Sequence, residues 1–283
     1  MVRLADFIHR SSTELQSLYP SPEARGMVLM LCEERLGVRS YTHVVEPDFA
    51  IPSEMEQVLE SDIRRLLNAE PIQYVLGFCD FYGRRFSVSP AVLIPRPETE
   101  LLVREAVVWA LAQQRPLRIL DMCTGSGCIA WSLHEEIPDA EVVGVDISEE
   151  ALAIAAGQFG KTGPEFMRMD VLGGIPDFGG RKFDLIVSNP PYIMEKEKAA
   201  MRPNVLDWEP GIALFVPDED PLVFYRAVAG WAEKLLAPGG LGVVEINETL
   251  GESTAAVFAG SGFSDVHQVS DYFGKSRFVK FSK

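Results

Sequence analysis

The sequence has few basic residues, few cysteines and no long hydrophobic run. Its 283 residues contain 26 Lys and Arg against 41 Asp and Glu, which gives a formal net charge of −15. A surplus of acidic side chains repels the phosphate backbone of nucleic acids. We therefore expect a protein without a direct nucleic-acid partner.

Neither a membrane anchor nor a metal site is indicated by the sequence. No apolar run approaches the roughly 18 residues that cross a bilayer. Arg3, Asp6 and Arg10 interrupt the first segment, where a signal peptide needs an apolar core. We expect a cytoplasmic protein that does not associate with membranes. No two cysteines have the two-residue gap of a zinc or redox motif, and no histidine has a partner at catalytic spacing, so we expect no metal.

The composition is that of a globular protein, with 47% hydrophobic and 24% charged residues, and the length suits one large domain or two ordinary ones. Residues 1–76 have the pattern of a helical domain. Ser21, followed by proline, indicates a helix start, and this helix is expected to end at Gly37. Ser53 and Glu56 have capping-box spacing at the start of a second helix.

After this domain the pattern changes to aromatic and turn residues. Alternation around Gly83 predicts a hairpin, and we assign residues 77–97 to a hairpin linker between two domains. A helix resumes at Glu98 and is expected to last until Pro116. Residues 98–283 then form the second domain.

In this second domain, candidate strands alternate with helix-length segments or longer connections. The alternation predicts an α/β fold with a doubly wound, seven-stranded and mainly parallel sheet. The connection between the last two strands, Ser270–Ser276, is too short for a helical crossover, so we expect the seventh strand to pair antiparallel with the sixth. The predicted strands are Leu117–Asp121, Glu141–Asp146, Phe166–Met169, Phe183–Ser188, Leu241–Ile246, Asp265–Val269 and Arg277–Phe281.

A glycine-rich turn, Cys123–Gly127, follows the first predicted strand, which ends at Asp121. Gly125 and Gly127 let the backbone approach a ligand, and the start of the following helix presents free N–H groups to it. Asp146 ends the next strand, 19 residues beyond Gly127, where a carboxylate can accept both ribose hydroxyls of a nucleoside. The spacing predicts a nucleotide site, but this stretch fits a nicotinamide cofactor as well as S-adenosylmethionine.

The segment Asn189–Tyr192, which reads Asn-Pro-Pro-Tyr, follows the fourth predicted strand. Its prolines lack N–H groups and stiffen the backbone, so the carbonyl groups of Asn189 and Pro190 stay available. Together with the Asn189 side-chain oxygen, they offer acceptors for a planar NH2 group whose nitrogen faces a methyl donor. Tyr192 supplies a flat wall against a planar amide or base. The segment therefore indicates chemistry on a planar nitrogen.

Several charged residues have two interpretations each. Asp170 follows the third predicted strand and lies either beside an adenine or in a simple turn. Arg96 either steers an anionic group at the mouth of the site or pairs with a nearby acid. We expect Glu98 and Glu100 to cap the following helix, and Glu209 to anchor a loop that covers the site.

The Asn-Pro-Pro-Tyr segment resembles the signature of class I S-adenosylmethionine-dependent methyltransferases that alkylate planar nitrogens. Further segments narrow this resemblance to the peptide chain release factor N5-glutamine methyltransferase family. They match that family in order and at similar spacing over most of the chain from Glu70 onward. The segments are EPIQYVLG (70–77), SPAVLIPRPETE (89–100), DMCTGSG (121–127), SNPPYI (188–193), WEPGIAL (208–214) and DYFGKSR (271–277).

This resemblance implies a Rossmann-like methyltransferase domain at residues 98–283 and a helical domain at residues 1–76 that docks the protein substrate. It implies methyl transfer from S-adenosylmethionine, leaving S-adenosylhomocysteine, to the glutamine amide nitrogen in the Gly-Gly-Gln loop of class I release factors. The expected donor-binding residues are Cys123, Thr124, Gly125, Ser126, Gly127, Asp146, Asp170, Val171 and Asn189. The expected substrate-binding residues are Asn189, Pro190, Pro191, Tyr192 and Arg96, and the expected catalytic residues are Asn189, Pro190 and Tyr192.

Four other functions stay open at this point. A methyltransferase acting on a glutamine of a ribosomal protein would share the same motif. An adenine-N6 nucleic-acid methyltransferase would also share it, but needs a basic surface. A non-catalytic S-adenosylmethionine-binding adaptor would not need the acceptor pair, and a dehydrogenase is disfavoured by that motif and by the short final connection. One departure from the family is Cys123, which stands where glycine is common and would perturb the donor pocket if the position needs positive φ.

Overall fold

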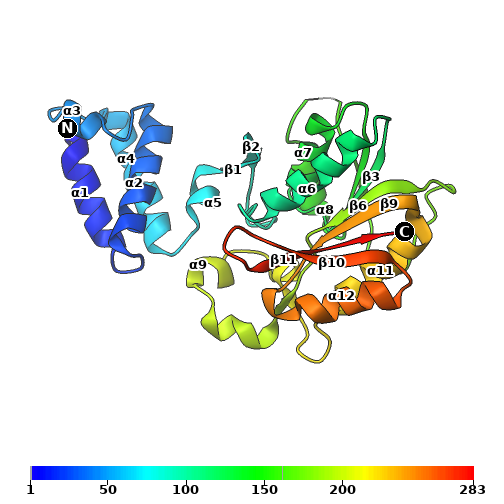
Figure 1. Cartoon of the computed structure of the whole chain (residues 1–283). Helices are drawn as coiled ribbons and strands as arrows, with labels where there is room; N and C mark the ends of the chain where they lie inside the picture. Colours follow the sequence, from blue (N-terminus) through cyan, green and yellow to red (C-terminus); the bar gives the residue numbers. More distant parts are fainter. Residues whose placement is uncertain (1, 161) are drawn as a thin grey trace. The chain divides into compact units, whose positions relative to one another are not determined.

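The computed structural model describes residues 2–160 and 162–283, which divide into two compact units (Figure 1). The first unit consists of the described part of Met1–Phe78 together with Arg202–Trp208. The second unit consists of Cys79–Met201 and Glu209–Lys283. The short segment Arg202–Trp208 therefore belongs to the first unit although both of its neighbours in the chain belong to the second.

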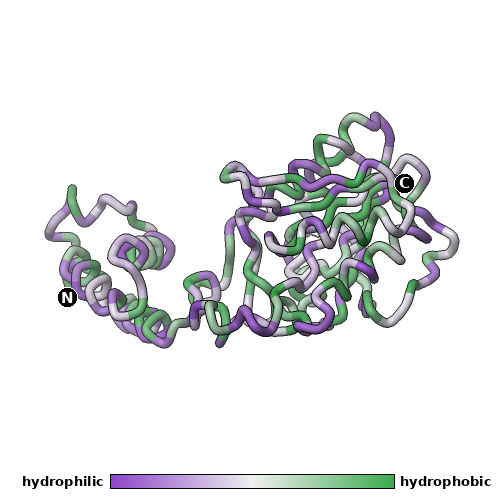
Figure 2. Tube along the Cα trace, turned by 60° about the horizontal axis from the view of Figure 1, so that its bottom comes forward, coloured by the Kyte–Doolittle hydropathy of each residue, from purple (hydrophilic) through white to green (hydrophobic). Residues whose placement is uncertain are grey.

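Helices whose hydrophobic and hydrophilic residues alternate along the chain build the first unit (Figure 2). The apolar faces of the four longest helices meet in one core that includes Phe7, Leu31, Leu59 and Leu66. This packing of apolar stripes stabilises helices that would be marginal alone. The helices are α1 (Leu4–Leu15), α2 (Ser21–Leu36), α3 (Thr42–Val45), α4 (Ser53–Leu67), α5 (Ile72–Leu76) and α9 (Pro203–Leu206).

The ends of these helices follow the sequence pattern in one case and depart from it in another. Helix α2 begins at Ser21 and ends before Gly37, whose φ of 67° makes the expected left-handed cap. The capping box predicted for α4 is wrong, because Pro52 is the N-cap and Ser53 already lies inside the helix. The Glu56 carboxylate instead accepts a hydrogen bond from the Val2 backbone N–H, at 2.9 Å.

The predicted hairpin is formed by β1 (Phe78–Phe81) and β2 (Arg84–Ser87). Both residues of its turn have positive φ, 49° at Tyr82 and 73° at Gly83. Such values at both central positions are those of a type I′ turn, whose twist matches that of two antiparallel strands. The hairpin is therefore closed by local geometry around the glycine that the sequence singled out.

The second unit is built on a seven-stranded sheet that contains all seven predicted strands, two with the predicted boundaries and five with shifted ones. The strand order is β10-β11-β9-β6-β3-β4-β5, and the five strands from β9 to β5 are parallel. The last strand is antiparallel to the sixth, as expected, and inserts between the fifth and the sixth. The strands are β3 (Arg118–Met122), β4 (Glu141–Asp146), β5 (Glu165–Arg168), β6 (Phe183–Ser188), β9 (Leu236–Glu245), β10 (Ser264–Ser270) and β11 (Ser276–Ser282).

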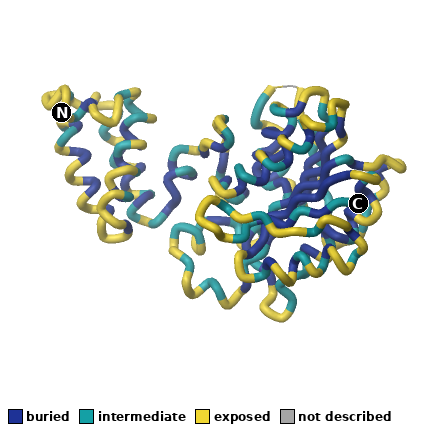
Figure 3. Tube along the Cα trace, viewed as in Figure 1, coloured by how far each residue is buried: buried dark blue, intermediate teal, exposed yellow. Residues whose placement is uncertain are grey.

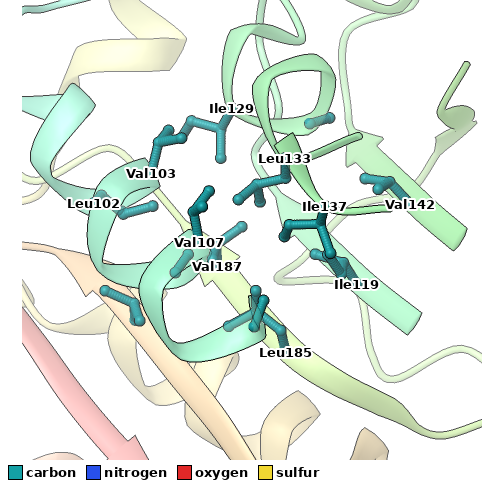
Figure 4. Close-up of a cluster of buried hydrophobic side chains, with 14 of the residues drawn as sticks. Leu102, Val103, Val107, Ile119, Ile129, Leu133, Ile137, Val142, Leu185 and Val187 are labelled. Atoms are coloured by element: carbon teal, nitrogen blue, oxygen red, sulfur yellow. The ribbon is translucent and has the colours of Figure 1, made fainter. Parts of the chain in front are cut away.

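Helices cover both faces of this sheet, so its central strands are buried (Figure 3). Alternate strand residues pack against the two faces: Ile119 lies in the first core cluster, on one face, and Leu120 in the second core cluster, on the other. Figure 4 shows the first cluster, in which side chains of α6 and α7 meet those of β3, β4 and β6. The long helices are α6 (Thr99–Ala112), α7 (Cys128–Glu136), α8 (Glu149–Ala156), α11 (Val223–Leu235) and α12 (Gly251–Gly260).

Short elements complete the second unit around the carboxyl ends of the parallel strands. The connection from β5 to β6, residues 169–182, is fully described and contains turns but no helix. The fold is thus the predicted doubly wound α/β sheet, with one crossover made by irregular chain. The remaining elements are β7 (Ile193–Met194), the 3-10 helix η1 (Glu195–Ala200), α10 (Gly211–Leu214), β8 (Phe215–Val216) and the 3-10 helix η2 (Glu248–Leu250).

Candidate active site

A cavity of about 250 Å³ lies within the second unit at the carboxyl ends of β3, β4 and β6. Parallel strands bring their carboxyl ends to one edge of a sheet, where ligands of open α/β folds bind. Ten of the predicted site residues line this cavity. They are Arg96, Cys123, Thr124, Gly125, Ser126, Asp146, Asp170, Val171, Asn189 and Pro191. Three others are neighbours in the chain that do not line it, namely Gly127, Pro190 and Tyr192.

The glycine turn is held open by the Asp146 carboxylate. Its Oδ2 accepts a hydrogen bond from the Gly125 N–H at 2.9 Å, and its Oδ1 accepts one from the Ser148 N–H at 3.0 Å. A carboxylate has about four lone-pair positions, so two of them remain available. Asp146 therefore shapes the turn and keeps acceptor capacity for the hydroxyl groups of a ligand.

Cys123 begins this turn with a φ of 60°, the left-handed conformation that favours glycine. A non-glycine residue there carries strain of roughly 1 to 2 kcal/mol. The Cys123 side chain packs against the second core cluster, and burial raises the pKa of its thiol well above the ordinary range. The departure noted in the sequence is thus accommodated with strain, and the raised pKa keeps the half-buried thiol in its neutral form.

Asp121 supports the glycine turn through a hydrogen bond to one of its residues, although the sequence did not single Asp121 out as a site residue. It is fully buried, and its Oδ2 accepts a hydrogen bond of 2.5 Å from the Thr124 hydroxyl. Burial, as the largest cause, raises the pKa of Asp121 from 3.8 to about 7. The signal that could have identified it was a carboxyl residue at the end of an apolar predicted strand.

The Asn189–Tyr192 segment leaves β6 directly after Ser188, whose hydroxyl donates to the Met122 carbonyl at 2.8 Å. Asn189 Nδ2 donates to the Thr99 hydroxyl oxygen at 3.3 Å. The Tyr192 hydroxyl donates to Glu245 Oε1 at 3.0 Å. The Tyr192 side chain is thereby fixed at its hydroxyl group, and its ring, which is partly buried, packs against the second core cluster.

Glu245 is the second functional candidate that sequence reasoning missed. It ends β9, is buried, and its Oε2 accepts a hydrogen bond of 2.6 Å from Thr99. Burial raises the pKa of Glu245, and the bonds donated by Thr99 and Tyr192 partly offset this effect. An acidic residue inside the apolar stretch LGVVEIN, residues 241–247, was the available signal.

Two charged residues join the segments that wall the cavity. Glu209 Oε1 accepts a hydrogen bond of 2.5 Å from Arg96, and its Oε2 accepts one of 3.1 Å from the Ile94 N–H. Glu209 is buried and directly precedes cavity residues of the 210–213 segment. It therefore has the anchoring role expected for it, and Arg96 takes the pairing alternative while also lining the cavity.

Other predicted roles are taken differently. Asp170 Oδ1 accepts the Leu172 N–H at 2.9 Å, which is the turn alternative, although Asp170 also lines the cavity. Glu98 and Glu100 lie at the start of α6, as expected, but their side chains do not cap it by hydrogen bonds. Glu98 is the N-cap of α6 without a side-chain bond, and Glu100 accepts the Tyr82 N–H at 2.8 Å instead. Proximity to the hairpin, which a helix pattern does not encode, decides the partner of Glu100.

No group of three or more His, Cys, Asp and Glu side chains in the described part of the chain is arranged to hold a metal ion. Among the helices of residues 2–160 and 162–283, none combines the length and apolarity that a membrane span requires.

The strand order, the glycine turn with Asp146, and the Asn189–Tyr192 segment at one sheet edge define a Rossmann-like methyltransferase domain. Residues 99–205 match the methyltransferase small domain family, and residues 6–77 match the PrmC N-terminal domain family. The release factor glutamine methyltransferase of Bacteroides thetaiotaomicron is 44% identical over 281 residues, 99% of each chain. That of Flavobacterium psychrophilum is 35% identical over 274 residues, 94% of each chain.

The chain therefore belongs to the release factor glutamine methyltransferase family. Among solved structures, a release factor-specific protein-(glutamine-N5) methyltransferase from Alicyclobacillus acidocaldarius is 30% identical. That alignment covers 70% of this chain and 99% of the other, with a TM-score of 0.43.

Proposed function

We propose that this enzyme transfers a methyl group from S-adenosylmethionine to the side-chain amide nitrogen of the glutamine in the Gly-Gly-Gln loop of class I peptide chain release factors. S-adenosylhomocysteine is the other product. The observation that carries the proposal is the single cavity lined by both the glycine turn and the Asn189–Pro191 segment. One cavity with a nucleoside end and an amide-binding end suits a reaction between these two substrates.

The donor end of the cavity has groups for each part of a nucleoside. The free lone pairs of Asp146 are available to the ribose hydroxyls. The backbone of Cys123–Gly127, with its positive φ values at residues 123, 125 and 127, allows close approach of the methionine part. Asp170 and Val171, which line the same cavity, are proposed to flank the adenine. S-adenosylmethionine supplies a methyl group activated by its sulfonium charge.

At the other end, the protein has to activate a poor nucleophile. The lone pair of an amide nitrogen is delocalised into its carbonyl group, so positioning and electrostatics must supply the catalysis. We assign the Asn189 side-chain oxygen and the Pro190 carbonyl as acceptors for the two N–H groups. Accepting both hydrogens orients the nitrogen and favours the positive charge that develops on it. Pro191 and Tyr192 are proposed to confine the plane of the amide.

The proposal extends to the domains and to the protein partner. Residues 1–76 would dock the release factor, residues 77–97 would link the domains, and residues 98–283 would carry out methyl transfer. The helical domain is a separate packing unit with its own core, which suits a docking module. Release factors act on ribosomes, so the reaction is proposed to take place in the cytoplasm, without direct contact to nucleic acid or membrane.

The test is incorporation of radioactive methyl groups from labelled S-adenosylmethionine. Release factor, ribosomal protein and adenine-rich DNA are offered in separate reactions. Label on the release factor alone, lost when its loop glutamine is replaced, is the expected result. Label only on ribosomal protein or only on DNA would replace the substrate, and no label on any of them would refute methyl transfer to these substrates.

A pair of variants tests the assigned acceptor. Asn189→Ala removes one of the two acceptors and should lower kcat by about 100-fold or more, as loss of one preorganised partner does elsewhere. Gln113→Ala removes a half-buried amide at the end of α6, away from the cavity, and should leave kcat unchanged. Equal activity of the two variants would contradict the role of Asn189.

A further inference from the structure

We propose that Glu245 is a positioning residue that acts through the Thr99 hydroxyl to set which end of the Asn189 amide faces the cavity. This inference rests on the proposed function, in which the Asn189 oxygen accepts an N–H of the substrate. It adds two residues, Glu245 and Thr99, to the machinery of the reaction. Neither carries out chemistry on the substrate in this scheme.

The three residues form a chain of hydrogen bonds drawn from distant parts of the sequence. Glu245 ends β9, Thr99 begins α6, and Asn189 follows β6. The Thr99 hydroxyl donates to Glu245 Oε2 at 2.6 Å, and the same oxygen accepts from Asn189 Nδ2 at 3.3 Å. Glu245 and Thr99 are 3% and 2% exposed, so water does not compete for these bonds. Thr99 and Asn189 both line the cavity.

The direction of each bond follows from counting protons. A hydroxyl group has one proton, and Glu245 in its ionised form has none to offer. The hydrogen bonds from Thr99 and Tyr192 favour this ionised form, because they lower the pKa that burial raises. The Thr99 proton therefore points to Glu245, and a lone pair of Thr99 points to Asn189. Only the NH2 end of the Asn189 amide can satisfy that lone pair. The Asn189 oxygen is consequently turned away from Thr99 and is free to accept a hydrogen bond in the cavity.

The second oxygen of the same carboxylate holds the other end of the segment. Glu245 Oε1 accepts the Tyr192 hydroxyl at 3.0 Å, while the Tyr192 carbonyl accepts from Asn247 Nδ2 at 3.2 Å. Both oxygens of Glu245 are thus occupied by donors from the wall of the site. One buried carboxylate orients the first and the last residue of Asn189–Tyr192.

The substitution Glu245→Gln reverses this logic with almost no change in shape. A carboxamide has one acceptor oxygen and one donor nitrogen, so it cannot accept from both hydroxyls. If its nitrogen faces Thr99, the Thr99 proton turns to Asn189, which must then present its NH2 group to the cavity. A donor would face the N–H of the substrate, and the bond that favours charge on the nitrogen would be lost.

The kinetic experiment uses the full-length enzyme with S-adenosylmethionine and a release factor. Glu245→Gln and Thr99→Val should each lower kcat by roughly 10- to 100-fold with KM for S-adenosylmethionine within about twofold of wild type. Thr99→Ser retains the hydroxyl and should restore most of the activity. The double variant should be no slower than the slower single variant, because both changes break one chain of bonds. Normal kcat in Thr99→Val, or multiplied losses in the double variant, would overturn the proposal.

Neutron diffraction from deuterium-exchanged crystals tests the orientation without any turnover. In the wild type, the Thr99 deuteron should point to Glu245, and deuterons on Asn189 should point to Thr99. A Thr99 deuteron directed at Asn189 would overturn the proposal even if the enzyme methylates release factors. If no release factor is methylated, the proposed function fails, and the deuteron positions in the wild type still decide the orientation.

Discussion

Asp121 provides a sharp test of how the donor turn is supported. The residue is fully buried, next to the last residue of β3, and accepts a hydrogen bond from the hydroxyl group of Thr124, a residue of the glycine turn. Asp121→Asn keeps the shape and an acceptor oxygen for Thr124 but removes the charge. We expect this variant to be more stable than the wild type at neutral and alkaline pH and to lose part of the pH dependence of stability.

The sign follows from the direction of the pKa shift. Burial raises the pKa of Asp121 from 3.8 to about 7 in the folded protein. As the pH rises between these values, the unfolded chain has already lost the proton that the folded protein still binds, so stability falls. The difference of about 3 pKa units corresponds to about 4 kcal/mol of unfolding free energy, which is fully lost above pH 7.

The assay is urea unfolding of the wild type and of Asp121→Asn at steps of pH between 5 and 8. The advantage of the variant should grow by about 3 kcal/mol over this range, since part of the total change occurs below pH 5. Asp177→Asn removes one exposed carboxylate of the same type and serves as the control. Its stability should follow the wild-type curve in parallel.

Two results would refute the reasoning. Parallel curves for the wild type and Asp121→Asn would mean that Asp121 does not titrate with a raised pKa. A variant that loses stability at every pH would mean that the charge strengthens the bond to Thr124 by more than its burial costs. Either outcome would mean that the burial of Asp121 does not lower the free energy of unfolding as the pH rises.

Three further predictions concern the same site. Gly127→Ala should cost about 3 kcal/mol of unfolding free energy, because its φ is +78° and the new Cβ would lie 2.9 Å from Ala155 Cβ. Gly125→Ala is the control: its new Cβ would lie in open space, so this variant should cost only about 1 kcal/mol. Equal costs in urea unfolding would contradict the clash. Cys123→Gly should be about 1 kcal/mol more stable than Cys123→Ala in thermal unfolding, because glycine alone adopts a φ of 60° without strain. Equal stability of the two variants would mean that the backbone at residue 123 is not strained. Glu209→Gln should lower the free energy of unfolding by about 2 kcal/mol, because it weakens the charge-assisted hydrogen bond from Arg96. An unchanged urea midpoint would contradict the anchoring role of Glu209.

Local signals in the sequence were enough to predict the sheet that positions the site and the two segments that meet in it. Apolar strands separated by helix-length segments determine a doubly wound sheet, because right-handed crossovers are the common way to join parallel strands. The glycine turn and the Asn189–Tyr192 segment each follow a strand of that sheet. Parallel topology brings them to one edge, so their meeting in one cavity could be predicted without knowing any distance.

The partners of polar groups could not be predicted in the same way. Glu56 has capping-box spacing and Glu100 lies in the first turn of a helix, yet they bind Val2 and Tyr82. Spacing along one helix shows which groups can meet locally. It does not show that a backbone N–H from another segment will lie closer to the carboxylate.

Burial is the other property that only the tertiary structure decided. Periodicity shows that a strand is buried, but the pKa of a carboxyl group on it depends on how completely water is excluded and which donors remain nearby. The sequence by itself determined which strands are followed by the glycine turn, by Asp146 and by Asn189–Tyr192, and it determined the chemistry of that last segment. The tertiary structure decided that Glu245 and Thr99, 146 residues apart, meet behind Asn189, because a hydrogen bond requires contact in space and is indifferent to distance along the chain.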